Sequence, residues 1–276
     1  MAPAMGEQST VRIDGCPVGH VASDDRGLAY GDGIFRTLCV IDGHVVALES
    51  HAQRLRHDCD RLALSAPPLN AIVADIDALC GVRGRFVVKI MITRGSGGRG
   101  YTPPLQPMCR RIVARHDLPD APRIPLTLAI ADVRLAEQPQ LAGVKHLNRL
   151  EQVLARRECV ARNAADLAMC DASGQLTATT MRNLVFSDAA GQWHTPSLAR
   201  AGVIGATRQR LMASRAARHD PVTECRMAPD ELKAFTGAIA CNSVGGAIAV
   251  AAIGDHHFEY SEAMAAHATE LLEETA

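Results

Sequence analysis

A proline-rich segment between residues 117 and 125 divides the chain of 276 residues into two parts. Three of the nine residues in this segment are prolines. Proline fixes φ and has no backbone N–H, so neither a helix nor a central strand continues through such a segment. The chain is also long enough for two domains of ordinary size. We therefore predict a small N-terminal α/β domain over residues 1–117, an interdomain linker over 118–123 and a larger C-terminal domain over 124–276.

Strand and helix patterns are mixed in the first of these parts. Asp42-Gly43 lies between two apolar runs, which predicts a β-hairpin with strands at 33–41 and 44–48. Ser50 and Gln53 have the spacing of a capping box, so we predict that Ser50 is the N-cap of the helix that follows. Further strands are predicted at 12–13, 18–21 and 86–92.

The second part has the same mixture. A helical pattern runs from about Leu147 to Ala161 and is marked by its apolar positions. These positions are Leu147, Leu150, Val153, Leu154 and Val160. Two more helices are predicted at 204–217 and 262–274, and strands at 126–133, 167–170, 176–180, 184–186 and 238–242. Together the two parts indicate an α+β (mixed α/β) fold class.

Composition removes several classes of function. The net charge is −1 at pH 7, which argues against a nucleic-acid or anionic-membrane partner. No apolar run approaches the roughly 18–20 residues that a transmembrane helix needs. The nine cysteines contain no Cys-x-x-Cys pair, so we expect reduced thiols and a cytoplasmic protein. No His-Glu-x-x-His or Gly-x-Ser-x-Gly motif is present, so we expect no metal and no serine nucleophile.

Lysine is rare in this chain, and this narrows the search for a nucleophilic amine. Only Lys89, Lys145 and Lys233 are lysines among 29 basic residues. Arginine stays protonated and cannot replace lysine in Schiff-base chemistry. Lys145 stands where a strand or loop end meets the predicted helix, and the helix N-terminus would favour its neutral, nucleophilic form. We therefore predict that any Schiff-base amine is that of Lys145.

Three segments could hold an anion. The loop Arg94-Gly-Ser-Gly-Gly-Arg-Gly-Tyr101 could present Arg94, Arg99 and Tyr101 to an anionic ligand, or could be a solvated hairpin tip. The segment Gly202-Val-Ile-Gly-Ala-Thr-Arg208 leads into a helix whose free N–H groups would favour a phosphate. Arg54 could add a bidentate contact from the first part of the chain.

These segments in combination resemble the fold type IV pyridoxal-phosphate enzymes, which include branched-chain aminotransferases and D-amino acid transaminases. The resemblance runs from about Ile13 to Ala249. Within this class the chain is most similar to the 4-amino-4-deoxychorismate lyases. The motifs that carry the resemblance are Asp25-Arg-Gly-Leu-Ala-Tyr-Gly-Asp-Gly-Ile-Phe-Arg-Thr37, His51-Ala-Gln-Arg-Leu55, Gly143-Val-Lys-His-Leu-Asn-Arg-Leu-Glu-Gln152 and the two glycine-containing segments above.

The resemblance implies a two-domain homodimer with pyridoxal 5′-phosphate as cofactor and the active site between the domains. Lys145 would bind the cofactor covalently and act as the catalytic base. The other cofactor-binding residues would be Arg54, Ala206, Thr207 and Ser243, and the substrate-binding residues Arg94, Arg99, Tyr30 and Tyr101. The implied reaction releases pyruvate from 4-amino-4-deoxychorismate and leaves 4-aminobenzoate, a folate precursor.

One position departs from the family pattern. Ala178 stands where the family normally has a glutamate that keeps the pyridine nitrogen protonated. Thr179, or another nearby threonine, could offer a hydroxyl to this nitrogen instead. Two alternatives therefore stay open beside the lyase: an aminotransferase of the same fold, and a catalytically silent descendant of the family.

Overall fold

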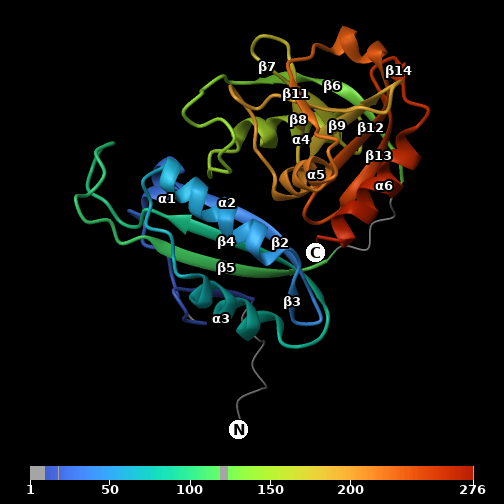
Figure 1. Ribbon diagram of the computed structural model, residues 1–276. Helices are drawn as coiled ribbons and strands as arrows, with labels where there is room; N and C mark the ends of the chain where they lie inside the picture. The colour runs from blue at the N-terminus through green and yellow to red at the C-terminus, as the bar shows by residue number, and fades with distance from the viewer. Residues whose placement is uncertain (1–9, 18, 119–123, 276) are drawn as a thin grey trace. The chain divides into compact units, whose positions relative to one another are not determined.

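The computed structural model describes residues 10–17, 19–118 and 124–275, which form two compact units (Figure 1). The first unit contains the described residues up to 118 together with Lys145–Asn148, and the second contains the others. Of the predicted linker 118–123, only Leu118 lies within the described residues. None of the helices in these ranges is both long and apolar enough to cross a membrane.

The first unit is built on a five-stranded antiparallel sheet with strand order β1-β5-β4-β2-β3. Its strands are β1 (Val11–Ile13), β2 (Gly33–Ile41), β3 (His44–Val45), β4 (Arg85–Thr93) and β5 (Arg110–Asp117). Its helices are α1 (Arg26–Tyr30), α2 (Leu48–Arg61) and α3 (Leu69–Cys80).

One face of this sheet is covered by α2 and α3. Arg36 of β2 reaches Asp58 of α2, and Arg111 of β5 reaches Asp75 of α3. The strand register places both arginines on the same face, because residues directly opposite each other in a ladder point the same way. The opposite face carries Phe35, which is only half-buried.

The predicted hairpin is confirmed, and the predicted capping box is wrong. Asp42 and Gly43 have φ of 47° and 78°, the two positive values of a type I′ turn. β3 is shorter than predicted because Ala47, with φ of 54°, turns the chain directly into α2. The helix therefore begins at Leu48, and Ser50 lies inside its first turn instead of capping it.

The predicted strand at 18–21 is also wrong. Residues 19–21 are not in a strand, and position 18 lies outside the described residues. The strand that pairs with β1 is β5, which is antiparallel to it from Val11 to Ile13, and beyond the Asp14-Gly15 turn only Cys16 forms a bridge back to Ile13 among the described residues. The predicted strand at 86–92 is confirmed as β4.

The second unit contains a nine-stranded sheet in which six strands close into a ring, in the order β9-β12-β13-β6-β7-β8 and back to β9. The strands are β6 (Leu126–Leu135), β7 (Leu167–Asp171), β8 (Leu176–Thr179), β9 (Asn183–Asp188), β10 (Trp193–Pro196), β11 (Thr223–Cys225), β12 (Phe235–Asn242), β13 (Gly246–Ile253) and β14 (His256–His257). The helices are α4 (Leu150–Ala161), α5 (Ala206–Ala217), α6 (Ser261–Glu273) and the 3-10 helix η1 (Pro229–Ala234). The strands and helices predicted here are thereby confirmed, most of them with shifted ends.

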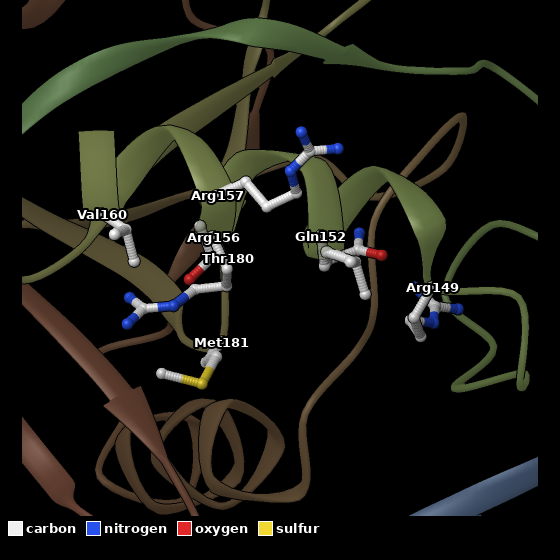
Figure 2. Close-up of a pocket in the computed structure, with 8 residues that line it drawn as sticks. Arg149, Gln152, Arg156, Arg157, Val160, Thr180 and Met181 are labelled. Carbon is white, nitrogen blue, oxygen red and sulfur yellow. The ribbon is translucent and has the colours of Figure 1, made fainter. Parts of the chain in front are cut away.

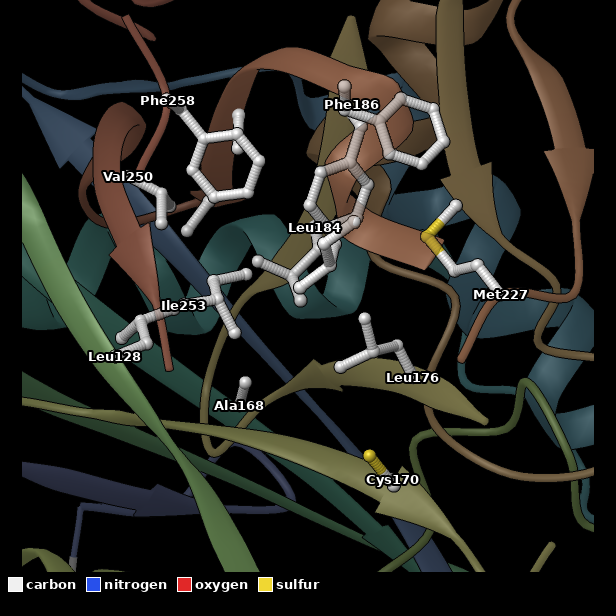
Figure 3. Packing of buried hydrophobic residues seen from close by; sticks show 14 residues of the cluster. Leu128, Ala168, Cys170, Leu176, Leu184, Phe186, Met227, Val250, Ile253 and Phe258 are labelled. Atoms are coloured by element: carbon white, nitrogen blue, oxygen red, sulfur yellow. The ribbon is translucent and has the colours of Figure 1, made fainter. Parts of the chain in front are cut away.

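The ring encloses the largest part of this unit's core. Figure 3 shows Leu128, Leu176, Leu184 and Phe186 pointing toward one another, together with Val250. Each of the six ring strands contributes at least one buried residue to this cluster. The strands therefore pair in a closed ring while their apolar side chains fill it.

Helix α4 begins three residues later than predicted. It begins at Leu150, because Lys145–Leu147 bond to strand β2 instead of joining the helix. The residues that it buries are Ala155 and Cys159. Four of the apolar positions in the predicted pattern are exposed: Leu150 by 76%, Val153 by 52%, Leu154 by 46% and Val160 by 79%.

Candidate active site

Lys145 is held against the open edge of strand β2. The Phe35 N–H donates to the Lys145 carbonyl, and the Leu147 N–H donates to the Gly33 carbonyl, each at 2.9 Å. The bridge between Ile34 and His146 makes this short segment an antiparallel addition to the sheet. Lys145 therefore faces the same side as Phe35, and its Nζ lies 4.4 Å from the centre of the Phe35 ring. Hydrogen bonds to β2 at Lys145 and at Leu147 thus fix the backbone of the predicted nucleophile.

A buried carboxylate joins Lys145 to Arg54. Asp58 of α2 is completely buried, and its Oδ1 accepts from Arg54 Nη2 at 2.9 Å. Its Oδ2 accepts from the Lys145 backbone N–H at 3.0 Å and from Arg36 Nη2. The structure therefore brings two of the predicted site residues, Lys145 and Arg54, to one carboxylate.

This cluster is rich in positive charge. Two buried guanidinium groups, those of Arg36 and Arg54, meet at the carboxylate of Asp58. Burial lowers the pKa of Arg36 to about 10, against the opposing effect of Asp58, and the charge of Arg54 lowers it further. Buried charges of one sign favour an anionic ligand, and arginine pairs well with phosphate. The residues present thus fit the phosphate group of the implied cofactor.

In the second unit, the start of α5 brings together three more predicted residues. The N-cap Gly205 provides no side-chain hydrogen bond to the helix, which follows with Ala206 and Thr207. The hydroxyls of Thr207 and Ser243 lie 3.2 Å apart. Asn183 accepts from the Gly205 N–H at 3.0 Å, and a Cβ on Gly205 would lie only 2.4 Å from this acceptor. An uncapped helix start beside two hydroxyls is suited to a phosphate.

The geometry gives Thr179 a different partner from the predicted pyridine nitrogen. Its Oγ1 donates to the buried Asp166 at 2.7 Å and accepts from the Arg182 N–H at 3.0 Å. Thr180 likewise donates to Asp166, at 2.6 Å, and Thr177 donates to a backbone carbonyl at 2.9 Å. A hydroxyl has one proton to donate. All three threonine hydroxyls thus donate hydrogen bonds within the unit.

Ala178 is on strand β8, opposite Met169 on β7 and Asn183 on β9. It is 9% exposed, and its methyl group has neither a donor nor an acceptor. Neither Ala178 nor the threonines beside it therefore supplies the ionised carboxylate that the family pattern has there.

Arg94 is held by contacts within the first unit. It is 9% exposed, and its three guanidinium nitrogens all donate hydrogen bonds there. They donate to Asp32 Oδ2 at 2.8 Å and to the carbonyls of Ala63 and Leu62 at 2.9 and 2.7 Å. Arg94 therefore joins the start of the glycine loop to the end of α2.

The other predicted substrate residues lie on or beside the exposed part of this loop. The rings of Tyr30 and Tyr101 are 5.4 Å apart, and Arg99 is exposed. Arg26 of α1, which sequence reasoning missed, donates to the carbonyls of Gly100 and Tyr101 at 3.1 and 2.8 Å. Arg26 therefore keeps the loop in one conformation.

Asp58 and Arg36 were missed as well. The only local signal for Asp58 was its position four residues after Arg54, where a helix brings side chains together. Arg36 is a charged residue in an otherwise apolar strand, a pattern that a buried ion pair explains.

Comparison with known proteins places this fold in a family. Residues 33–253 match the family of class IV amino-transferases, which is most of the chain. The chain belongs to this family. Its members are pyridoxal-phosphate enzymes, so the predictions of an enzyme, of its cofactor and of the fold type IV class are confirmed at this level.

Two lyases and an aminotransferase are similar to this chain. The chain is 32% identical to aminodeoxychorismate lyase of Vibrio harveyi over 205 residues, 72% of this chain and 75% of the relative. The crystal structure of 4-amino-4-deoxychorismate lyase from Pseudomonas aeruginosa superposes on this chain with a TM-score of 0.87. The two sequences are 34% identical, and the superposition covers 96% of this chain and 98% of the other. It is 27% identical to D-alanine aminotransferase of Staphylococcus epidermidis over 157 residues, 53% of each chain.

Proposed function

We propose that this chain is a pyridoxal-phosphate-dependent lyase that converts 4-amino-4-deoxychorismate to 4-aminobenzoate and pyruvate. The observation that carries the proposal is the 34% identity to a solved 4-amino-4-deoxychorismate lyase over 96% of this chain. The arrangement of Lys145 and Arg54 on one buried carboxylate supports it.

We propose as cofactor-binding residues those that the resemblance implies, with the exception of Thr179. In the first unit, Lys145 would bind the cofactor covalently and Arg54 would pair with its phosphate. In the second unit, the backbone N–H groups of Ala206 and Thr207 and the hydroxyls of Thr207 and Ser243 would bind phosphate oxygens. Thr179 is left out of this set, because its hydroxyl donates to Asp166.

The proposed mechanism needs one group that holds and moves a proton. When bound, pyridoxal phosphate supplies an electron sink for the carbon that bears the substrate nitrogen. The Lys145 amine, held beside the Phe35 ring, would take the proton from this carbon. The enolpyruvyl oxygen then leaves with its bonding electrons, and the six-membered ring becomes aromatic.

The substrate has two carboxylates, and we propose that the glycine loop helps to bind them. Arg99 is the exposed cation of this loop, and Tyr30 and Tyr101 lie together beside it. Arg94 and Arg26 would act indirectly by fixing the loop.

The test is an assay of the purified protein with 4-amino-4-deoxychorismate, in which 4-aminobenzoate and pyruvate are both measured. We expect equal amounts of the two products. The Lys145→Ala variant should lose activity by several orders of magnitude, because it lacks both the covalent anchor and the base. Keto-acid exchange with amino acids, but no 4-aminobenzoate, would instead favour the aminotransferase that the Staphylococcus epidermidis relative suggests. A protein that binds no cofactor would favour the silent descendant, for which Ala178 is the main argument.

We also propose that the protein is a cytoplasmic homodimer. Helix α4 presents its exposed apolar side chains beside Met181, and Figure 2 shows Met181 and Val160 with the arginines of this surface. A second copy could cover these side chains. The nine cysteines are all free thiols, in keeping with a reducing compartment.

A further inference from the structure

We propose that Asp58 is a positioning residue that holds the nucleophilic lysine and the phosphate-binding arginine in one fixed relation. This inference rests on the proposed function for the roles of Lys145 and Arg54. The contacts of Asp58 themselves are properties of the folded first unit.

Each carboxylate oxygen of Asp58 accepts a hydrogen bond from a different site residue. Oδ1 accepts from Arg54 Nη2 at 2.9 Å, and Oδ2 accepts from the Lys145 N–H at 3.0 Å. Arg36 donates to Oδ2 from the neighbouring strand and, at 3.3 Å, to the Arg54 carbonyl. A shift of the carboxylate would therefore move the acceptor of the lysine backbone and the partner of Arg54 together.

The backbone of Lys145 has partners on two elements. Its carbonyl accepts from the Phe35 N–H of β2, and two residues further on the Leu147 N–H donates to the Gly33 carbonyl. The Lys145 N–H donates to Asp58 Oδ2 at 3.0 Å. Asp58 supplies the acceptor from α2, which fixes the end of the segment from which the lysine side chain projects.

Asp75 shows what a purely structural carboxylate looks like in the same unit. It is 2% exposed, and like Asp58 it accepts from two arginines, Arg12 at 3.0 Å and Arg111 at 2.7 Å. These contacts join α3 to β1 and β5. Asp75 thus matches Asp58 in burial and in charge partners but differs from it in the contact with Lys145.

The experiment compares Asp58→Ala with Asp75→Ala in the full-length protein. Three quantities are measured: the urea midpoint, the amide exchange rate of the peptide around Lys145, and the Kd for pyridoxal 5′-phosphate from the absorbance of the bound cofactor. Both variants should lose stability. Only Asp58→Ala should exchange about tenfold faster around Lys145 and bind the cofactor about tenfold more weakly, the effect of losing one charged hydrogen bond. Asp75→Ala should stay within about twofold of the parent in both.

A second variant covers the case in which Asp58→Ala does not fold. Asp58→Asn keeps the volume and one acceptor oxygen, so exchange around Lys145 should stay near that of the parent. The Kd should still rise, because the amide NH2 group then faces Arg54 and cannot accept the hydrogen bond that holds the guanidinium in place. The inference is overturned if exchange and Kd respond alike to the Asp58 and Asp75 variants, or if the Kd of Asp58→Asn equals that of the parent. If the parent has no lyase activity but the exchange pattern is as expected, the proposed function is overturned and this inference stands. If the parent binds no cofactor, the exchange rates of the Asp58 and Asp75 variants alone decide the inference.

Discussion

Two arginines on helix α2 stand two residues apart and have different environments. Arg54 is buried and pairs with Asp58, whereas the side chain of Arg56 is 53% exposed. We expect Arg54→Ala to weaken the binding of pyridoxal phosphate by about 1.5–3 kcal/mol, because a charge-assisted hydrogen bond to the phosphate is lost. Titration of the protein with the cofactor measures this, and Arg56→Ala is the control that should bind as the parent does. Equal affinities of the parent and Arg54→Ala would assign Arg54 to the fold alone.

Ala178 leads to a prediction about the ratio of elimination to amino transfer. A protonated pyridine nitrogen stabilises the long-lived carbanion that amino transfer needs, whereas elimination with a good leaving group needs it only briefly. The hydroxyls of the neighbouring threonines donate their hydrogen bonds to Asp166 and to a backbone carbonyl. We therefore expect the natural protein to catalyse elimination with little amino transfer. Ala178→Glu should increase the formation of pyridoxamine phosphate from amino acids, measured at saturating amino acid. The explanation fails if the natural protein transaminates as fast as it eliminates.

At the level of elements, the glycine loop depends on one carboxylate. Asp32 accepts from Arg26 at 2.9 Å and from Arg94 at 2.8 Å, and so ties α1 to the end of β4. Burial alone would raise the pKa of Asp32, but the hydrogen bonds and charges of Arg94 and Arg26 outweigh it and lower this pKa below 3.8. A lowered native pKa adds stability above the unfolded pKa, and this stability is lost as the pH falls through the native pKa.

We therefore expect Asp32→Asn to unfold more easily than the parent at pH 7, by about 1–3 kcal/mol for the lost charged hydrogen bonds. The difference should shrink as the pH falls below about 4, where the parent's carboxyl begins to take up its proton. Urea unfolding at a series of pH values from 7 to 3 measures it. The exposed Asp60→Asn is the control, and a difference between Asp32→Asn and the parent that stays constant with pH would contradict the account.

For the whole molecule, the exposed face of α4 predicts an association. If a second copy covers it, the protein should sediment at about twice the 29.4 kDa of the chain. Val160→Glu should weaken this dimer by about 1.5–3 kcal/mol, the usual contribution of one buried aliphatic side chain. Val82, which is 82% exposed on the first unit, provides the control Val82→Glu. Sedimentation of the parent as a monomer at micromolar concentration would contradict the prediction.

The sequence by itself determined the features that local chemistry encodes. Asp42-Gly43 required the left-handed backbone of a type I′ turn, the nearly continuous apolar run of β4 favoured a strand, and the scarcity of lysine pointed to Lys145. Only the tertiary structure decided which side chains meet. Lys145 follows the edge of β2, a strand more than a hundred residues away in sequence, and its N–H reaches Asp58, which is 87 residues away. Thr179 could have been oriented to a ligand, but Asp166, the residue before β7, accepts its hydrogen bond. Hydrogen bonds are short and directional, so their partners are fixed by the fold that brings distant residues together.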